Sequence, residues 1–350
     1  MARKTKDNAE GTAELSITDY MKKFSQNGGF EEFITDRPQF STGCLTNDIA
    51  LNGGWARDRV IEIYGPSGSM KTSNAGLGLA SYQRTFDEDA PFLFVEVERS
   101  TLRRFFQGLG VKTGNIWVEK PRTAEDAMNF ISNTIRTGKF RGCILDSIDA
   151  LESQEEVGKD YGEATMMKLP KLLSEAMRDL SKACVDYDCF IMLINQVRTG
   201  MAQYGSFETT SGGKAIPYYA SQRVRFASKG PSKENPLAIS IETQVKKNKL
   251  GPLIKAETLV DFIPGKGWDV VSDHFNLGES LTLLDRKGSY YDIRLDLETE
   301  TPIARVQGFN GFASWLDTGT NKAAFQEACK VAARSVQVEE FDNDQAQNAY

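Results

Sequence analysis

The residues with the clearest chemical potential lie in one short stretch, IEIYGPSGSMKTS, at residues 61–73. Gly65, Lys71 and Thr72 have the spacing of a phosphate-binding loop, G-x-x-x-x-G-K-[ST], but Met70 replaces its second glycine. In such a loop backbone N–H groups surround phosphate oxygens, the lysine reaches the β- and γ-phosphates, and the hydroxyl ligates Mg²⁺. Two interpretations of Met70 stay open. A position that needs positive φ costs a non-glycine residue about 1–2 kcal/mol, whereas one that needs only small size directs the side chain away from the nucleotide.

Three polar residues at the ends of apolar runs complete a candidate site for phosphoryl chemistry. Asp146 ends GCILD, Glu98 ends FLFVEVE and Gln196 ends CFIMLINQ. Asp146 is expected to hold Mg²⁺ through water, and Glu98 to orient and deprotonate an attacking water. Gln196 leads into a long polar segment, which it would order on sensing a γ-phosphate. The competing interpretation of both acids is that they are solvated strand ends.

A segment rich in Gly, Thr and Ser, residues 199–213, has the features of a nucleic-acid-binding loop. Tyr204 and Phe207 lie between Arg198 and Lys214, and aromatic rings flanked by cations suit stacked bases and phosphates. The net charge of the chain is −6, but residues 198–249 hold nine basic and three acidic residues. This local surplus favours phosphate contact. The alternative for Tyr204 is that it caps the core.

An α/β framework is needed to bring these side chains together. Apolar runs at VIEIYG, FLFVEVE, NIWVEK, GCILDSI and CFIMLINQV alternate with helical segments, which predicts a mostly parallel sheet covered on both faces. One helix spans residues 123–137 and opens with Thr123 and Asp126 in a capping box. After about residue 223 strands follow one another without helices, which predicts an antiparallel extension.

The two ends of the chain have patterns of their own. Residues 16–25 predict an amphipathic arm helix that packs either on its own core or on a neighbouring subunit. Residues 279–293 predict a hairpin in a small C-terminal domain, and residues 322–334 predict a helix before an acidic tail. The expected organisation is an arm at 1–38, an ATPase core at 39–268, a small α/β domain at 269–336 and the tail at 337–350.

Composition narrows the class of protein. No run of about 18 apolar residues is present, and the polar start has no secretory h-region, so no membrane partner is expected. The five scattered cysteines imply neither disulfides nor zinc, which fits a cytoplasmic location. The single histidine, His274, is interpreted as structural.

Taken together, these stretches resemble the RecA recombinase family over roughly residues 41–333. The matching segments are STGCLTNDIALNGGWARDRVIEIYGP, FVEVERSTLRRFFQGLGV, ILDSIDAL, INQVR, ETTSGGKAIPYYASQRV, VKKNK and GESLTLLDRKGSYYDI…ASWL. The resemblance implies a RecA-like P-loop ATPase that binds ATP and Mg²⁺ between subunits of a helical filament on single-stranded DNA. It also implies pairing of that strand with homologous duplex DNA, in recombination and in the repair of DNA damage.

The resemblance also implies roles for individual residues. Those expected at the nucleotide are Gly65, Pro66, Ser67, Gly68, Ser69, Met70, Lys71, Thr72, Ser73, Phe105 and Asp146, with Thr72 and Asp146 at the metal. Those expected in catalysis are Lys71, Glu98, Gln196, Lys247 and Lys249, the last two reaching the ATP of a neighbouring subunit. Those expected at DNA are Met166, Lys171, Arg178, Arg198, Tyr204, Thr209, Thr210, Ser211, Gly212 and Gly213.

Two departures from the family pattern concern the nucleotide: Met70 replaces the loop glycine, and Leu102 replaces an aspartate near the adenine. Strand exchange is the leading interpretation of the function. A filament protein that binds ATP and DNA but hydrolyses slowly is one alternative, and a helicase motor with the same core is another. A helicase requires turnover, whereas a recombinase pairs strands on binding energy alone.

Overall fold

The computed structural model describes residues 38–98, 103–155, 168–202, 205–233, 235–251, 257–299 and 301–347. The expected arm helix, Leu102, Met166 and Tyr204 lie outside the described residues. The chain from Gln39 onward forms one unit, and all that follows concerns this unit.

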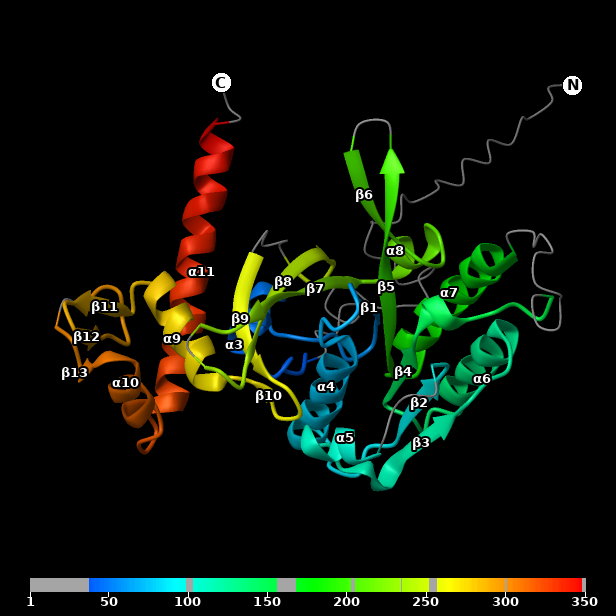
Figure 1. The fold of residues 1–350 in the computed structure, drawn as a ribbon, viewed down its shortest axis with the longest axis horizontal. Coiled ribbons are helices and arrows are strands. Elements are labelled where there is room, and N and C mark those ends of the chain that lie inside the picture. Colours follow the sequence, from blue (N-terminus) through cyan, green and yellow to red (C-terminus); the bar gives the residue numbers. More distant parts are fainter. Residues whose placement is uncertain are drawn as a thin grey trace, which may run out of the picture. The chain divides into compact units, whose positions relative to one another are not determined.

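A ten-stranded sheet forms the centre of this unit (Figure 1). Across the sheet the order is β10 (Gly267–Trp268), β9 (Glu257–Ile263), β8 (Ile239–Asn248), β7 (Gln222–Pro231), β1 (Val60–Gly65), β5 (Phe190–Ala202), β4 (Gly142–Asp146), β2 (Phe92–Glu96) and β3 (Ile116–Glu119), with β6 (Gly205–Thr210) paired to β5. The strands from β7 to β3 are parallel, whereas β8, β9 and β10 continue the sheet in antiparallel pairs. The predicted α/β class and its antiparallel extension are confirmed.

Helices cover both faces of the parallel strands because side chains alternate along each strand. Ile61 and Ile63 of β1 pack in a core with α4 (Lys71–Thr85) and α5 (Arg103–Gly108). Val60 packs on the other face, with α6 (Ala124–Arg136), α7 (Lys168–Asp186) and α8 (Ala215–Tyr219). Helix α6 begins as predicted, since the Thr123 hydroxyl accepts a hydrogen bond from the Asp126 N–H at 3.1 Å.

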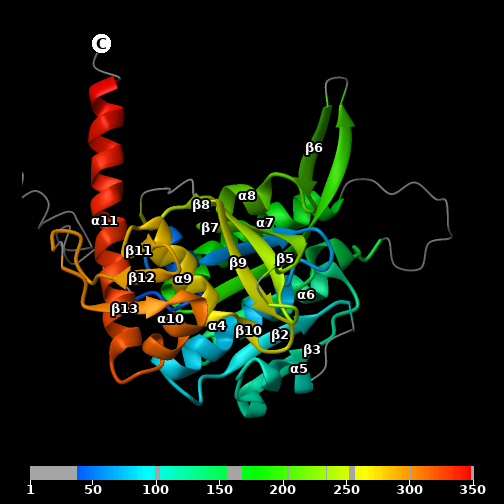
Figure 2. The same cartoon turned by 60° about the vertical axis from the view of Figure 1, so that its left-hand side comes forward.

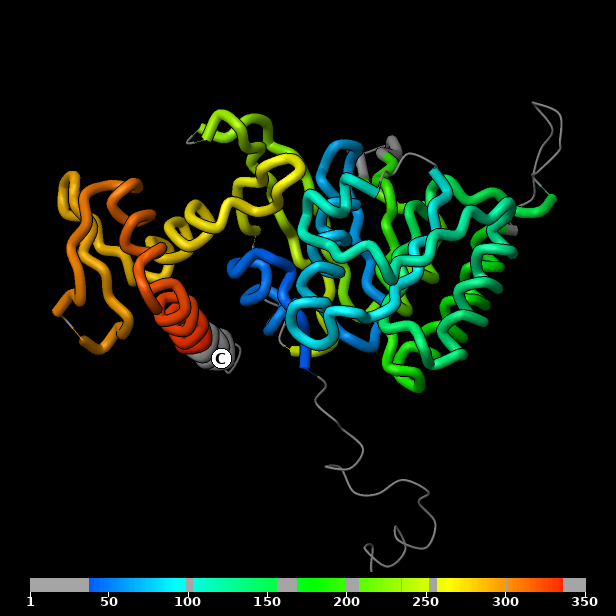
Figure 3. The backbone as a smooth tube through the Cα atoms, turned by 90° about the horizontal axis from the view of Figure 1, so that it is seen from below, coloured from blue at the N-terminus to red at the C-terminus, as the bar shows by residue number. Residues whose placement is uncertain are grey.

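A small domain follows the sheet, seen from yellow through orange to red in Figure 3. Its three-stranded sheet consists of β11 (Leu284–Lys287), β12 (Tyr290–Ile293) and β13 (Ala304–Gln307), and its helices are α9 (Val270–Ser280), α10 (Gly308–Leu316) and α11 (Asn321–Gln347). Phe312 and Phe325 are fully buried in its core. The predicted hairpin is confirmed as β11–β12. Helix α3 (Leu45–Ala50) packs against this domain, and its Leu45 N–H donates to the buried carboxylate of Asp273 at 2.7 Å.

Two sequence expectations are wrong at the level of local structure. The segment expected as an irregular loop is largely a β-hairpin, in which the far half of β5 pairs with β6 and projects from the sheet (Figure 2). Its cross-strand partners, such as Val197 and Thr210, have the branched side chains that favour strands. The helix expected to end near residue 334 continues as α11 to Gln347, so most of the acidic tail has a helical backbone.

The far edge of the large sheet is formed by β3, between the short helix η1 (Thr113–Asn115) and α6. Trp117 and Val118 on this strand are 64% and 55% exposed, and within the described ranges no further strand pairs beyond β3. All five cysteines are buried free thiols. Among the described helices, none combines the length and apolarity needed to cross a membrane.

Candidate functional site: a phosphate loop beside a projecting hairpin

The phosphate loop lies at one edge of the parallel part of the sheet. Strands β1, β4 and β2 end there and β5 passes it at Gln196, so the loop meets Asp146, Gln196 and Glu98. This edge is where ligands bind in open α/β sheets. The residues form a cavity of about 230 Å³, lined by Ser67, Gly68, Ser69, Met70, Lys71, Thr72, Ser73, Glu98, Asp146, Ile194 and Gln196.

Gly65 begins the loop at a point that admits no side chain. A Cβ atom on this residue would lie 1.9 Å from the carbonyl oxygen of Phe226 in the neighbouring strand β7. The close approach fixes the direction in which the chain leaves β1. The Ser69 hydroxyl then donates to the Pro66 carbonyl at 2.8 Å and closes the turn.

Met70 adopts the conformation that glycine normally supplies. Its φ of 62° and ψ of 27° are left-handed, so the position requires positive φ rather than merely a small residue. The thioether side chain is half-buried and packs against the core under α4. This packing offsets part of a backbone cost of about 1–2 kcal/mol.

Lys71 opens α4 and is buried at the floor of the loop. Its ammonium group donates to the Gly65 carbonyl at 3.0 Å and to the Pro66 carbonyl at 2.7 Å. Burial lowers the lysine pKa, and the nearby carboxylates of Asp146 and Glu98 partly oppose that shift. The cation is therefore held within the loop, next to the place where phosphate oxygens would sit.

Thr72 and Asp146 are the residues whose oxygen atoms would hold a metal ion. The Thr72 hydroxyl donates to the Asp146 carboxylate at 2.7 Å, and burial raises the pKa of Asp146 to about 6. A desolvated carboxylate beside a hydroxyl fits Mg²⁺, which prefers hard oxygen ligands. The donor set therefore fits a magnesium-bound nucleotide, with Lys71 supplying the second positive charge.

Glu98 connects the turn after Asp146 to the end of β5. Its carboxylate accepts hydrogen bonds from the Ser147 hydroxyl at 2.7 Å and from the Gln196 side-chain amide at 3.3 Å. It is exposed to solvent, so a water molecule can reach its carboxylate. The structure thus brings together five of the residues expected to act on the phosphates, namely Lys71, Thr72, Glu98, Asp146 and Gln196.

Phe105, Lys247 and Lys249 lie elsewhere in the described part of the chain and do not line this cavity. Phe105 is half-buried on α5 beside Phe106, with ring centroids 5.6 Å apart. The Lys247 ammonium group donates to the carbonyls of Pro217 and Tyr218 at 2.7 and 2.8 Å, and burial lowers its pKa to about 8. Lys249 is exposed.

The residues expected at DNA fall into two groups. Lys171 and Arg178 are exposed on α7. Arg198, Thr209 and Thr210 belong to the β5–β6 hairpin, and Ser211, Gly212 and Gly213 follow it directly. The two glycines have φ values of 88° and 70°, so both use a backbone conformation that favours glycine.

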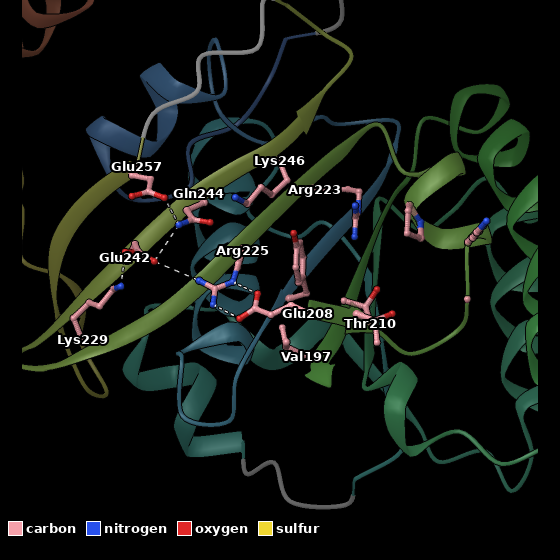
Figure 4. A pocket seen from close by; sticks show the side chains of 15 residues that line it. Val197, Glu208, Thr210, Arg223, Arg225, Lys229, Glu242, Gln244, Lys246 and Glu257 are labelled. Atoms are coloured by element: carbon pink, nitrogen blue, oxygen red, sulfur yellow. Dashed lines mark hydrogen bonds and ion pairs between the residues drawn. The ribbon is translucent and has the colours of Figure 1, made fainter. Parts of the chain in front are cut away.

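A groove of about 870 Å³ lies between the hairpin and the open face of β7 and β8 (Figure 4). Arg225 projects into it but pairs with Glu208 at 2.7 Å and with Glu242 at 3.3 Å. Lys229 also pairs with Glu242, and Arg223 pairs with the buried Glu62. Much of the positive charge expected to meet phosphates is therefore already matched by carboxylates of the same chain.

Comparison with known proteins decides the family. Residues 22–269 match the model of the RecA N-terminal domain. Among curated relatives, "Protein RecA" of Delftia acidovorans is 33% identical over 267 residues, which cover 75% of this chain and 72% of the relative. "Protein RecA" of Citrifermentans bemidjiense is 32% identical over 294 residues, covering 82% and 86%. That of Acinetobacter baumannii is 31% identical over 299 residues, covering 81% and 84%.

The chain belongs to the RecA family. Sequence reasoning missed three polar residues of this RecA-family chain that hydrogen-bond to residues of the cavity or of the hairpin: Ser147, Asp149 and Asn195. Asn195 gave a partial signal because it stands next to Gln196 in an otherwise apolar strand. Ser147 and Asp149 gave none, since their partners are 49 to 62 residues away along the chain.

Proposed function

We propose that this RecA-family chain is an ATP- and single-stranded-DNA-dependent recombinase. It assembles as a helical filament on DNA and catalyses homologous pairing and strand exchange in recombination and repair. A cytoplasmic location belongs to the same proposal. Family membership supports the general assignment, and the arrangement around β5 supports the dependence on both ligands.

The observation that carries the proposal is the continuity of β5. This strand places Gln196 at the phosphate cavity and then continues, from Val197, as the first arm of the projecting hairpin. A displacement of Gln196 by a γ-phosphate would therefore act on the hairpin through one uninterrupted backbone. Nucleotide binding and DNA binding become coupled events.

In this mechanism ATP supplies the phosphoryl group, and a bound Mg²⁺ would supply positive charge beside it. Lys71 exchanges the carbonyls of Gly65 and Pro66 for phosphate oxygens. Thr72 and Asp146 would hold the metal, Asp146 through water, while Glu98 accepts the proton of the attacking water. Lys247 and Lys249 contact the nucleotide of a neighbouring subunit, so hydrolysis depends on assembly.

The first test is hydrolysis of ATP by the pure protein with and without single-stranded DNA. We expect DNA to stimulate hydrolysis strongly. We also expect strand exchange to proceed when a non-hydrolysable analogue replaces ATP. Exchange that requires turnover would favour a helicase motor. Binding of ATP and DNA without hydrolysis would favour the slow filament protein instead.

Lys71→Ala tests the nucleotide site directly. The phosphates lose their principal cation, so nucleotide-dependent binding of single-stranded DNA should disappear in an anisotropy titration. Lys139→Ala removes an exposed lysine and serves as the control. Unchanged nucleotide-dependent affinity in Lys71→Ala would reject the assignment of the phosphate loop.

A further inference from the structure

One carboxylate holds both arms of the β5–β6 hairpin where they leave the sheet. Asp149 Oδ1 accepts a hydrogen bond from Arg198 Nε at 2.8 Å, and Arg198 Nη2 lies 2.6 Å from the same atom. The Ser211 hydroxyl also donates to Asp149 Oδ1. Arg198 lies on β5, and Ser211 directly follows β6, so this contact fixes the spacing of the two arms at their base.

Asp149 belongs to the turn that carries the metal-site aspartate. It lies in the 3₁₀ helix η2 (Ile148–Ala150), three residues after Asp146, the last residue of β4. Ser147, between them, donates to Glu98 in the phosphate cavity. The base of the hairpin is therefore attached to the turn that carries Asp146 and that hydrogen-bonds, through Ser147, to Glu98.

A second contact, made by Asn195 of β5, holds Ser211 from inside the sheet. The fully buried Asn195 side-chain amide donates to the Ser211 carbonyl at 2.9 Å and to Glu62 Oε1 at 3.1 Å. Its oxygen accepts the Gln196 backbone N–H at 2.9 Å, so all three contacts of this amide are satisfied. Glu62 lies in β1, three residues before Gly65, and Arg223 neutralises its carboxylate.

We propose that Asp149 is a positioning residue that transmits the state of the nucleotide site to the hairpin, with Asn195 as its buried counterpart. This inference rests on the proposed function. Ser211 is held between Asp149, in the turn after β4, and Asn195 of β5, which also bonds to Glu62 of β1, so a displacement of either partner acts on Ser211 directly. The Arg198 side chain is 65% exposed and that of Asp149 24%, and an ion pair open to solvent on one side adds little to stability. Its contribution lies in fixing geometry, which makes Asp149 separable from the fold.

The coupling between nucleotide and DNA is the quantity to measure. Anisotropy of a labelled single-stranded oligonucleotide gives the dissociation constant with and without a non-hydrolysable ATP analogue, and the ratio of the two is the coupling. Asp149→Ala removes both contacts, whereas Asp149→Asn keeps an acceptor oxygen and loses the charge. We expect the ratio to fall by about fivefold in Asp149→Ala, the worth of one hydrogen bond, and by less in Asp149→Asn.

Glu152→Ala is the matched control, because Glu152 is an exposed acid three residues further along the chain. Its side chain makes no hydrogen bond or ion pair to the hairpin residues that the structure describes. Nucleotide affinity, followed with a fluorescent analogue, and the melting temperature should match wild type in all three variants. A merely structural role for Asp149 would change these two quantities and leave the ratio unaltered.

An unchanged coupling ratio in Asp149→Ala, in a protein whose wild type shows coupling, would overturn this inference alone. A wild type that binds single-stranded DNA equally well with and without nucleotide would overturn the proposed function together with it. A fall in the ratio for Glu152→Ala as large as that for Asp149→Ala would assign the effect to net charge rather than to the contacts of Asp149 with Arg198 and Ser211.

Discussion

At the scale of single residues, the site depends on groups held in conformations or protonation states that they do not favour. Met70 is left-handed without being glycine, and Asp146 is a buried carboxylate whose pKa lies above its ordinary value. Both sit within the cavity that we assign to the phosphates. Such local costs commonly mark functional sites.

The backbone cost at Met70 can be separated from the packing of its side chain. Met70→Ala keeps the left-handed φ and loses the packing, whereas Met70→Gly loses the packing and relieves the backbone. We therefore expect Met70→Gly to be more stable than Met70→Ala by about 1 kcal/mol in urea unfolding. Gly68→Ala is the control, because its φ is +73° and nothing lies within 4 Å of the added Cβ. It should cost a similar amount, and equal stability of the two Met70 variants would contradict the argument.

Asp146 makes magnesium-dependent nucleotide binding sensitive to pH. Since metal binding requires the carboxylate and its pKa is about 6, apparent affinity should fall about tenfold from pH 8 to pH 5. Fluorescence titrations of the magnesium nucleotide across this range would measure it. Asp146→Asn is the control, because the pH dependence that remains in this variant comes from the nucleotide itself. A pH dependence equal to that of the wild type would refute the role of Asp146.

In the protein without nucleotide, the stability of the fold depends on pH in the opposite direction: protonation of Asp146 stabilises it. The folded pKa of Asp146 lies above its ordinary value of 3.8, so the proton binds more tightly in the folded state. Its contribution to the free energy of unfolding is fully present below pH 3.8 and is lost as the pH rises through 6. Binding of a cation at neutral pH compensates the charge that burial disfavours.

The main site residues were predictable from sequence by two local signals. Glu98, Asp146 and Gln196 each stand where an apolar run stops, and Lys71 has the spacing of the phosphate-loop pattern. The parallel strands bring these segments to one edge of the sheet. Asp149 and Asn195 were not identified because their importance comes from contacts between distant segments. No local pattern reports that Ser211 lies between them. Tyr204 and Met166 remain predictions.

At the scale of elements, local signals placed the helices and strands of the core well. The capping residue Thr123 gives the start of α6, and the alternating apolar runs give the parallel strands. The hairpin was missed because a two-stranded ribbon is specified by pairing between its arms, and its Gly and Ser residues have weak intrinsic preference. The extension of α11 was missed because its acidic charge suggested a solvated tail, although Glu, Gln and Ala favour helix.

The N-cap of α6 gives a direct test of one such local signal. Thr123→Ala leaves the Asp126 N–H without its acceptor and should lower the free energy of unfolding by about 1 kcal/mol. Thr123→Ser keeps the hydroxyl and should remain close to wild type in the same chemical denaturation experiment. Equal losses in the two variants would mean that the methyl group, not the cap, is responsible.

At the scale of the whole molecule, the distribution of charge matters more than its sum. The groove beside the hairpin contains several cations that are already paired with Glu208, Glu242 and Glu62. The end of the chain carries four acids, Glu339, Glu340, Asp342 and Asp344, and no basic residue. Both features reduce the attraction of the subunit for phosphate.

Removing the acidic end should therefore speed the capture of duplex DNA. Truncation after Gln337 removes the four negative charges, and we expect faster association in stopped-flow measurements at low salt. The difference should vanish at about 1 M salt, where the Debye length is about 3 Å. Replacing the four acids by amides keeps the chain length and serves as the control. A rate unaffected by either change at low salt would reject this repulsion.

The edge strand β3 gives the protein an optical reporter of its own. Trp55 and Trp268 are 0% and 6% exposed, and Trp315 packs against the core of the small domain, whereas Trp117 is 64% exposed. An aqueous collisional quencher such as iodide should therefore extinguish mainly the emission of Trp117. Protection from iodide would signal, without any label, that something has covered this edge of the sheet.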